Sequence, residues 1–549
     1  MTAVGAHSAV GGGPPPTCDY VVVGAGSAGC VLANRLTADG VSRVLLLEAG
    51  GRDDSFWIHL PVGYFRTIYD RRFSRLFDTV PAEGTAGRNV VWPRGRILGG
   101  SSSINGLIYI RGQHQDYDDW SGLGANGWDY ASVLPYFKRS ERYAGGESRY
   151  HGAAGELGVS DLRNDHPYCA AWVEAGCQFG LPHNPDFNAE TDYGVGAYQL
   201  SIRNGWRASA ARCFLRPAEG RPNLTVLTGA HATRVLFEGT TAVGVEWLRE
   251  GRIASARADR EVILCAGAIQ SPQILQLSGI GPPPVLSRAG VRVLHPSAQV
   301  GENLQDHYQA RTIVRLRRKM SLNDQVRNPV ALARMGLEWL LHDRGPLTVG
   351  AGQVGGFART EHAQDSRADV QFNVMPVSVD KPGDPLHRFS GFTASASQCR
   401  PLSRGRLSIQ SSDPLAQPRI EPDYFRDPHD GKVIVAGIRM LRDIFRQPAF
   451  RELWVEEMLP GESATSDAAL YDFARTKGGT VFHPVGTCRM GEDADAVVDS
   501  QLRVRGVERL RVVDASVMPT LVSANTNAAA IMIGERGAAL VMGRDRPAD

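Results

Sequence analysis

Three glycines near the start of the chain have the spacing that lets a backbone approach a dinucleotide. Gly24, Gly26 and Gly29 form the pattern G-x-G-x-x-G, with Ser27 and Ala28 between the last two. The first glycine of this pattern makes a tight turn, the second lets a pyrophosphate come close to the backbone, and the third lets a helix pack closely on a strand. The N-terminus of that helix favours the charge of the phosphates. The spacing predicts a dinucleotide site, with an ordinary strand–turn–helix connection as the alternative.

The elements that must position these glycines are indicated by the residues on either side. Residues 20–23 form an apolar, β-branched run that predicts a buried strand, and residues 30–36 continue with helical spacing. A second apolar strand is predicted over residues 43–48, and it ends on Glu48, whose carboxylate is placed to bind ribose hydroxyls. This context favours the dinucleotide site but does not distinguish NAD from FAD.

A second glycine-rich segment has the composition of a ligand-binding loop. Residues 95–106 read GRILGGSSSING and include Gly99, Ser102 and Asn105. Such a loop offers many backbone N–H groups and little side-chain bulk, which suits a flat or anionic ligand. A flexible surface loop would not need the apolar side chains that are interspersed here, among them Ile104.

Length and composition limit the classes of protein that fit. The chain has 549 residues, and one hydrophobic core rarely grows beyond about 250–300 residues, so we expect two or more domains. A formal net charge of +2 argues against nucleic acid as the main partner. Glycine, at 61 residues, exceeds the usual share and indicates many tight turns or close backbone approaches.

Cysteine usage and targeting signals point to the cytoplasm. The eight cysteines form no C-x-x-C pair and no Cys/His cluster with zinc spacing, so neither a metal site nor a disulfide framework is predicted. Residues 1–17 lack the features of a signal peptide and are expected to form a flexible tail. No run of about 18 apolar residues occurs, so no transmembrane segment is expected. We therefore expect a cytoplasmic protein.

Five separated motifs, taken together, resemble the glucose–methanol–choline (GMC) family of FAD-dependent oxidoreductases, and most closely bacterial choline and alcohol dehydrogenases. The motifs lie, in family order, at residues 24–29, 95–106, 267–281, 300–307 and 482–491. The likeness extends from about residue 19 to about residue 540, which is nearly the whole chain.

The resemblance implies an α/β fold in which a Rossmann-like FAD-binding domain is interleaved with a sheet-and-helix substrate domain. The expected FAD-binding domain comprises residues 18–161, 223–310 and 478–545, and the expected substrate domain comprises residues 162–222 and 311–477. A strand predicted over residues 511–516 would lie beside the first strand of the chain.

The resemblance also implies the residues of the site. His483, in the setting His-Pro-x-Gly-Thr, is expected to be the catalytic base, a role that suits an imidazole with a pKa near 6.5. Asn525 stands where the family has His or Asn and is expected to hold the substrate oxygen; the alternative is that it only caps the last helix. Asp306 and His307 are expected to form a structural turn near the cofactor. The expected FAD-binding residues are Gly24, Gly26, Ser27, Ala28, Gly29, Glu48, Gly99, Ser102, Asn105, Ala232, Asp514, Ala515 and Asn527.

One departure from the family concerns the bond to the flavin. Some members carry in the second motif a histidine that is covalently bound to FAD, and Ile104 stands at that position here. We therefore expect FAD to be bound non-covalently.

The predicted function is oxidation of a primary alcohol to the aldehyde, in which His483 takes the hydroxyl proton and a hydride passes to flavin N5. Four alternatives remain open: a choline dehydrogenase, a lyase like the hydroxynitrile lyases that share this fold, a flavoprotein without turnover, and an NAD-dependent dehydrogenase. The electron acceptor, whether oxygen, a quinone or a redox protein, is not indicated by the sequence.

Overall fold

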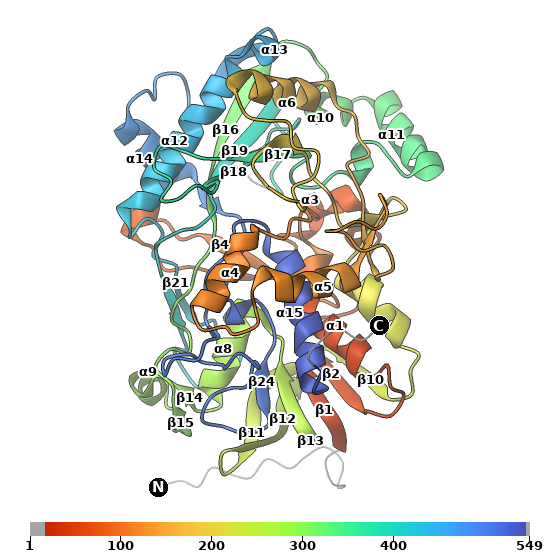
Figure 1. The fold of residues 1–549 in the computed structure, drawn as a ribbon, viewed down its shortest axis with the longest axis vertical. Helices are drawn as coiled ribbons and strands as arrows, with labels where there is room; N and C mark the ends of the chain where they lie inside the picture. The colour runs from red at the N-terminus through yellow and green to blue at the C-terminus, as the bar shows by residue number, and fades with distance from the viewer. Residues whose placement is uncertain (1–16, 381–382, 545–549) are drawn as a thin grey trace.

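Two seven-stranded sheets organise the computed structural model, which describes residues 17–380 and 383–544 (Figure 1). The expected tail over residues 1–16, and residues 381–382 and 545 of the expected domains, lie outside the described residues. Thr17 is the first residue of strand β1, so the tail prediction is wrong at that position. Its backbone is held in the sheet by pairing with Arg257.

The first sheet, in the lower half of Figure 1, is largely parallel. Its parallel strands are β10 (Leu224–Thr228), β2 (Val44–Glu48), β1 (Thr17–Val23), β13 (Arg252–Leu264) and β24 (Leu510–Val512). The antiparallel strands β12 (Thr241–Arg249) and β11 (His231–Glu238) extend it beyond β13. The strand expected near residue 511 is β24, but it pairs with β13 and not with β1, because β13 lies between them.

Helices from opposite ends of the chain pack together on this sheet. These are α1 (Ser27–Leu36) and α15 (Thr526–Val541), which lie side by side, and α5 (Tyr130–Ser140), which contacts α15 (Figure 1). A Cβ added to Gly29 would lie 1.9 Å from the carbonyl oxygen of Gly24, so only glycine lets α1 start so close to β1. The hydroxyl of Ser27 donates to Oδ1 of Asn527 at 2.8 Å, which joins the starts of the two helices.

The second sheet, in the upper half of Figure 1, is antiparallel. Its order is β22 (Trp454–Leu459), β16 (Tyr308–Leu316), β19 (Gly391–Gln398), β18 (Val370–Met375), β17 (Val354–Ala358) and β7 (Gly194–Ala197), and β23 (Gly479–Thr480) also pairs with β16. Helices α12 (Pro428–Phe445), α6 (Pro167–Phe179) and α14 (Asp467–Lys477) cover it. The buried side chains of Leu441 and Phe445 on α12 join the core over this sheet.

The remaining elements connect or flank the two sheets. They are α2 (Phe56–His59), α3 (Tyr64–Thr67), β3 (Ser74–Asp78), β4 (Val91–Gly95), α4 (His114–Gly122), β5 (Glu141–Tyr143), β6 (Leu157–Val159), β8 (Ile202–Arg203), β9 (Trp206–Arg207), α7 (Arg216–Ala218), α8 (Gly267–Leu277), β14 (Ile280–Gly281), α9 (Pro283–Arg288), β15 (His295–Pro296), α10 (Leu322–Gln325), α11 (Pro329–His342), β20 (Arg406–Ser408), β21 (Arg419–Glu421) and α13 (Pro448–Arg451). Within the described part of the chain, no helix is both long enough and apolar enough to cross a membrane.

Candidate active site

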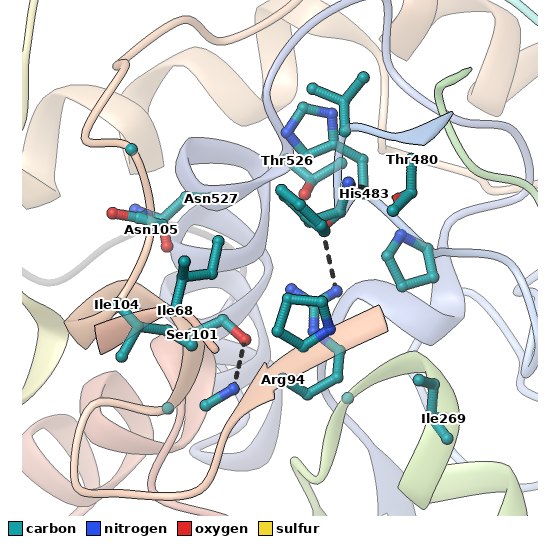
Figure 2. Close-up of a pocket in the computed structure, with 18 of the residues that line it drawn as sticks. Ile68, Arg94, Ser101, Ile104, Asn105, Ile269, Thr480, His483, Thr526 and Asn527 are labelled. Atoms are coloured by element: carbon teal, nitrogen blue, oxygen red, sulfur yellow. Dashed lines mark hydrogen bonds between the residues drawn. The ribbon is translucent and has the colours of Figure 1, made fainter. Parts of the chain in front are cut away.

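A cavity of about 990 Å³ is lined by residues of both sheets, a volume at the upper end of the range for small-molecule sites. Most of the site residues expected from the sequence line it. These are Gly24, Gly26, Ser27, Ala28, Glu48, Asn105, Ala232, His483, Asp514, Ala515, Asn525 and Asn527. Ile104 also lines the cavity, beside Asn105 (Figure 2).

One end of the cavity is the start of α1, which offers free backbone donors. Gly26 occupies the N-cap position, no side chain caps the helix there, and its first turn holds no acidic residue. The amide groups at this end are therefore available to an anion. Both carboxylate oxygens of Glu48 accept hydrogen bonds from the neighbouring backbone, from Ala25 N at 2.9 Å and from Gly50 N at 2.7 Å. Burial raises the pKa of Glu48 to about 7.

Three of the expected residues do not line the cavity but shape its wall. Gly29 packs against the turn, as described above. Gly99, at φ +85°, donates from its backbone N to Ala25 O at 2.7 Å. Ser102 donates to Gly99 O at 2.6 Å and accepts from Ala210 N at 2.9 Å, so it fixes the loop from behind.

The other end of the cavity holds His483, on the chain that follows β23. Its backbone N donates to Oδ1 of Asp306 at 2.7 Å. The preceding residue, Phe482, has a φ of +68°, and its carbonyl accepts from Nη1 of Arg94 at 3.0 Å (Figure 2). The carboxylate of Asp306 also accepts from Thr480 Oγ1 at 2.6 Å and from the hydroxyl of Tyr424. These bonds fix the backbone that carries the side chain of His483.

The ring nitrogens of His483 have distinct partners, and these fix its tautomer. Nε2 of His307 lies 2.8 Å from the carbonyl oxygen of Cys399, and Nδ1 of His307 lies 2.9 Å from Nδ1 of His483. Burial lowers the pKa of His307 to about 4, so this ring is neutral near pH 7. Because a carbonyl oxygen only accepts, Nε2 of His307 carries the hydrogen and its Nδ1 accepts one from His483. Nε2 of His483 thereby carries no hydrogen and has a lone pair that can accept one.

That lone pair points to Asn525. Nδ2 of Asn525 lies 3.2 Å from Nε2 of His483, and Oδ1 of Asn525 accepts from Nε2 of Gln371 at 3.4 Å. Asn525 occupies the N-cap position of α15, yet its side chain makes no capping hydrogen bond. Burial, together with His307 and Arg94, lowers the pKa of His483 well below its usual value. The site therefore presents a neutral base next to an amide donor.

The prediction that Asp306 and His307 form a structural turn is wrong. The two residues form no turn but lead directly into β16, and His307 contacts His483 through its ring. The pairing of β16 with β23, which sets Tyr308 opposite Thr480, brings position 307 next to position 483. The motif at residues 300–307 contains His307, but nothing in the sequence indicates that His307 contacts His483.

Part of the cavity wall is aromatic and apolar. It includes Tyr64, Phe65, Ile68, Tyr69, Met375, Val379 and Phe482. Tyr69 meets Phe482 edge-on with ring centroids 6.4 Å apart. The cation Arg311 and the acids Asp380 and Asp384 also line the cavity. Of these side chains, only Phe482 could be placed at the site from the sequence, because the others come from segments without a motif.

In the described part of the chain, no group of three or more His, Cys, Asp or Glu side chains is arranged to hold a metal ion.

Comparisons with known proteins cover nearly the whole chain. The family model described as GMC oxidoreductase matches in its N-terminal part at residues 18–309 and in its C-terminal part at residues 401–534. The chain is 40% identical over 535 residues to the alcohol dehydrogenase [acceptor] of Pseudomonas putida, covering 95% of each chain. It is 41% identical over 534 residues to the mitochondrial choline dehydrogenase of Homo sapiens, covering 96% of this chain and 90% of that protein.

Solved structures with the same architecture include two oxidases. Pyridoxine 4-oxidase from Mesorbium loti superposes with a TM-score of 0.86 at 32% identity, covering 95% of this chain and 98% of that one. Formate oxidase superposes with a TM-score of 0.88 at 25% identity, covering 96% of this chain and 98% of that one.

Proposed function

Because this chain belongs to the GMC oxidoreductase family, we propose that it oxidises a primary alcohol to the aldehyde with FAD, using His483 as the base. Family membership, oxidoreductase activity on CH–OH groups and the α/β fold with an FAD-binding domain and a sheet-rich substrate domain were predicted and are confirmed. We further propose the segments expected for the two domains, 18–161, 223–310 and 478–545 against 162–222 and 311–477. Strands β16 and β23, which both belong to the second sheet, lie at two of these boundaries.

The cavity fits FAD, which the family binds. A Cβ on Gly100 would lie 2.7 Å from Gly26 Cα, and one on Gly24 would lie 2.5 Å from Cys265 O, so the wall there is bare backbone. Such a wall lets a pyrophosphate reach the amides at the start of α1. Glu48 would bind the ribose hydroxyls. The start of α15 would favour negative charge at the flavin. Bound FAD would supply the hydride acceptor.

We propose that FAD is bound non-covalently. Ile104 lines the cavity at the position where some family members attach the flavin, and an alkyl side chain has no nucleophile for such a bond. After acid precipitation the yellow colour should stay in the supernatant. Colour retained in the pellet would contradict this proposal.

The mechanism follows from the tautomer of His483. The hydroxyl of the substrate donates to Nε2 of His483, which takes its proton, while Nδ2 of Asn525 donates to the same oxygen. The carbon-bound hydrogen then leaves with its electron pair, so the alcohol loses one proton and one hydride and becomes the aldehyde. The observation that carries this proposal is the 3.2 Å approach of His483 Nε2 and Asn525 Nδ2 at the cavity wall.

For the substrate we propose a neutral alcohol with an aliphatic or aromatic body. The aromatic and aliphatic part of the cavity lining favours it. Choline is the second candidate, because Tyr69 and Phe482 with Asp380 offer aromatic faces and a carboxylate to a quaternary ammonium. The similarity to choline dehydrogenases supports this candidate equally well.

Anaerobic mixing of the purified holoenzyme with a panel of neutral alcohols and with choline tests both candidates. Bleaching of the flavin by neutral alcohols supports the first, and bleaching by choline alone supports the second. If no alcohol bleaches the flavin, the redox proposal fails and a lyase of this fold becomes the better reading. Parallel turnover with oxygen and with an artificial dye identifies the class of electron acceptor. The cytoplasmic location stays a prediction.

A further inference from the structure

Arg207 is a buried cation that has no acid as its partner. Its side chain is 1% exposed, and burial lowers its pKa to about 9, so it is still protonated near pH 7. The other buried arginines of the described chain each pair with a carboxylate: Arg35 with Glu535, Arg111 with Glu141, Arg442 with Glu457 and Arg511 with Glu261. Arg207 forms no ion pair with a described residue. Because a buried charge is costly unless an opposite charge compensates it, this exception indicates a function.

A tight hairpin turns Arg207 inward. Strands β8 and β9 set Ile202 opposite Arg207, and the residues that connect the strands, Asn204 and Gly205, have φ values of +51° and +71°. Positive φ at both central positions is typical of a type I′ turn, for which Asn-Gly is a favoured sequence. Since successive side chains of a strand point to opposite faces, Trp206 and Arg207 diverge, and Arg207 is the buried one.

The guanidinium of Arg207 contacts the glycine-rich loop of residues 95–106. Nη1 donates to Ser102 O at 3.2 Å and to Oδ1 of Asn105 at 2.8 Å, and Nε donates to Ile58 O at 2.9 Å. Nη2 makes no hydrogen bond to a described residue. All of these partners are neutral oxygens, so the positive charge is not cancelled within the described part of the chain.

Asn105 connects this charge to the cavity. Its Oδ1 accepts from Arg207 and also from Leu107 N at 3.1 Å, which fixes the orientation of the amide. The side chain lies at the cavity wall beside Ile104 (Figure 2). Nδ2 of Asn105 makes no hydrogen bond to a described residue, so it is available as a donor to a ligand in the cavity.

We propose that Arg207 is a positioning residue that orients Asn105 and stabilises the negative charge of the reduced flavin. The inference rests on the proposed function, since it takes FAD as the hydride acceptor. A hydride carries two electrons and one proton, so the neutral flavin ring gains one negative charge, while the hydroxyl proton of the alcohol goes to His483. Arg207 supplies the opposite charge from behind the loop and raises the reduction potential of the flavin.

The phosphates of FAD fit this charge less well. The loop approaches the start of α1 at Gly100, where a Cβ would lie 2.7 Å from Gly26 Cα, and Arg207 makes no hydrogen bond at that end of the loop. The other end of the loop continues into Leu107, which belongs to the same buried cluster as Ala524, the residue before the N-cap of α15. The charge therefore lies towards the end of the cavity where the hydride is proposed to be transferred.

The midpoint potential of the bound flavin, measured by equilibration with a reference dye and a chemical reductant, tests the proposal. Arg207→Met removes the charge, and Arg207→Lys keeps it on a side chain of similar size. We expect the equilibrium constant for reduction to fall at least tenfold in Arg207→Met, which is about 30 mV for a two-electron couple, and to fall by less in Arg207→Lys. Arg442→Met is the matched control, because Arg442 is buried and paired on α12 and does not line the cavity, and its folded fraction should keep the wild-type potential.

The affinity of each apoprotein for oxidised FAD and its thermal midpoint, measured in parallel, report on packing. If Arg207→Met binds no FAD, Arg207→Gln, which keeps a hydrogen-bond donor without the charge, should show the same fall in potential. The proposal is overturned if the neutral variant that binds FAD keeps the wild-type potential, even where its affinity for FAD falls, because the charge would then serve the phosphates or the fold. An equal fall in Arg207→Lys and Arg207→Met also overturns it, since the cause would be the lost hydrogen bonds.

Failure of the proposed function gives a different result. In that case no alcohol reduces the wild-type flavin, whereas the chemical reductant still reports the potential of each variant.

Discussion

Two buried histidines of this protein differ in charge near pH 7, one cationic and one neutral, and their partners explain the difference. Both ring nitrogens of His151 face carboxylates: Nδ1 lies 3.0 Å from Glu141 and Nε2 lies 2.9 Å from Asp186. Although burial opposes the charge, these bonds raise the pKa of His151 to about 9. The ring of His483 is hydrogen-bonded to no carboxylate, only to His307 and Asn525, and burial, with His307 and the cation Arg94, lowers its pKa. Burial keeps an imidazole neutral where no carboxylate is in contact with it, and contact with carboxylates keeps it charged.

The His151 cluster is structural. Glu141 also accepts from Arg111 Nη2 at 2.8 Å and from Gly152 N at 2.8 Å, so one buried carboxylate holds two cations and a backbone amide. The cavity lining includes neither His151 nor Glu141. His151 is therefore a cation that stabilises the fold, whereas His483 is a neutral side chain that can take up a proton.

The largest expected effect is on catalysis. His483→Ala removes the proton acceptor, and anaerobic reduction of the flavin by a good alcohol should slow by at least a hundredfold, or about 3 kcal/mol. His151→Gln is the matched control, and its folded fraction should reduce the flavin at the wild-type rate. A His483→Ala protein that reduces flavin at near wild-type speed would refute the role of this residue.

The second effect is on stability. Glu141→Gln leaves Arg111 buried without its carboxylate, and removing one partner of a buried pair costs about 3 kcal/mol. Urea unfolding should show this loss, while the rate of flavin reduction per folded molecule stays unchanged. Glu190→Gln, at an exposed carboxylate that pairs with Arg149, should change stability by less than about 1 kcal/mol. A loss of equal size in both variants would show that burial of the pair is not the cause.

The third effect separates the two histidine sites by pH. Because the pKa of His307 is about 4 when folded, the unfolded chain, with a pKa near 6.5, binds a proton that the folded protein excludes. Stability from this group is complete above about pH 6.5 and is lost as the pH falls, by about 2 kcal/mol between pH 7 and pH 5.

For His151, with a pKa of about 9, the sign is reversed: its stability is complete below about pH 6.5 and is lost as the pH rises through about 9. Unfolding measured across this pH range should lose its acid slope in His307→Leu and its alkaline slope in His151→Gln. If the wild type and both variants show the same dependence of stability on pH, the acid range is not due to His307 and the alkaline range is not due to His151.

The smallest effect concerns the hydrogen bond from His483 to His307. His307→Leu removes the acceptor for Nδ1–H of His483, so its tautomer is no longer fixed, and flavin reduction should slow about tenfold. The acid limb of the plot of kcat/KM against pH should also shift to higher pH, because His307 contributes to the low pKa of His483. His307→Asn, which keeps an oxygen acceptor, should recover part of the rate. If the pH profile of His307→Leu is unchanged, His307 contributes only to packing.

Local patterns of the sequence predicted several helices and strands, but they did not predict the contacts between distant segments. The turn at Gly24, Gly26 and Gly29 is a local pattern, and the strands and helix around it occur where they were predicted. The contact of His307 with His483 joins positions 176 apart and depends on the register of β16 against β23, which no local pattern contains. The orientation of Asn525 likewise depends on Gln371, a residue of the other sheet.

The polarity of α11 shows a second limit. Apolar residues recur at helical spacing along both faces of this helix, so the sequence does not tell which face meets the core. Only the packing of Met335 and Trp339 identifies the inner face, while Val330, Leu340 and other apolar side chains of this helix are exposed.

The hydrogen bond between Ser27 and Asn527 joins residues 500 positions apart, and this has a consequence during synthesis. At about 5–20 residues per second, α15 leaves the ribosome tens of seconds after α1. Throughout that interval the side of α1 that packs on α15 is uncovered, and Arg35 lacks its buried partner Glu535. The nascent chain therefore exposes that side of α1 until α15 has been made, and release before residue 526 leaves it uncovered.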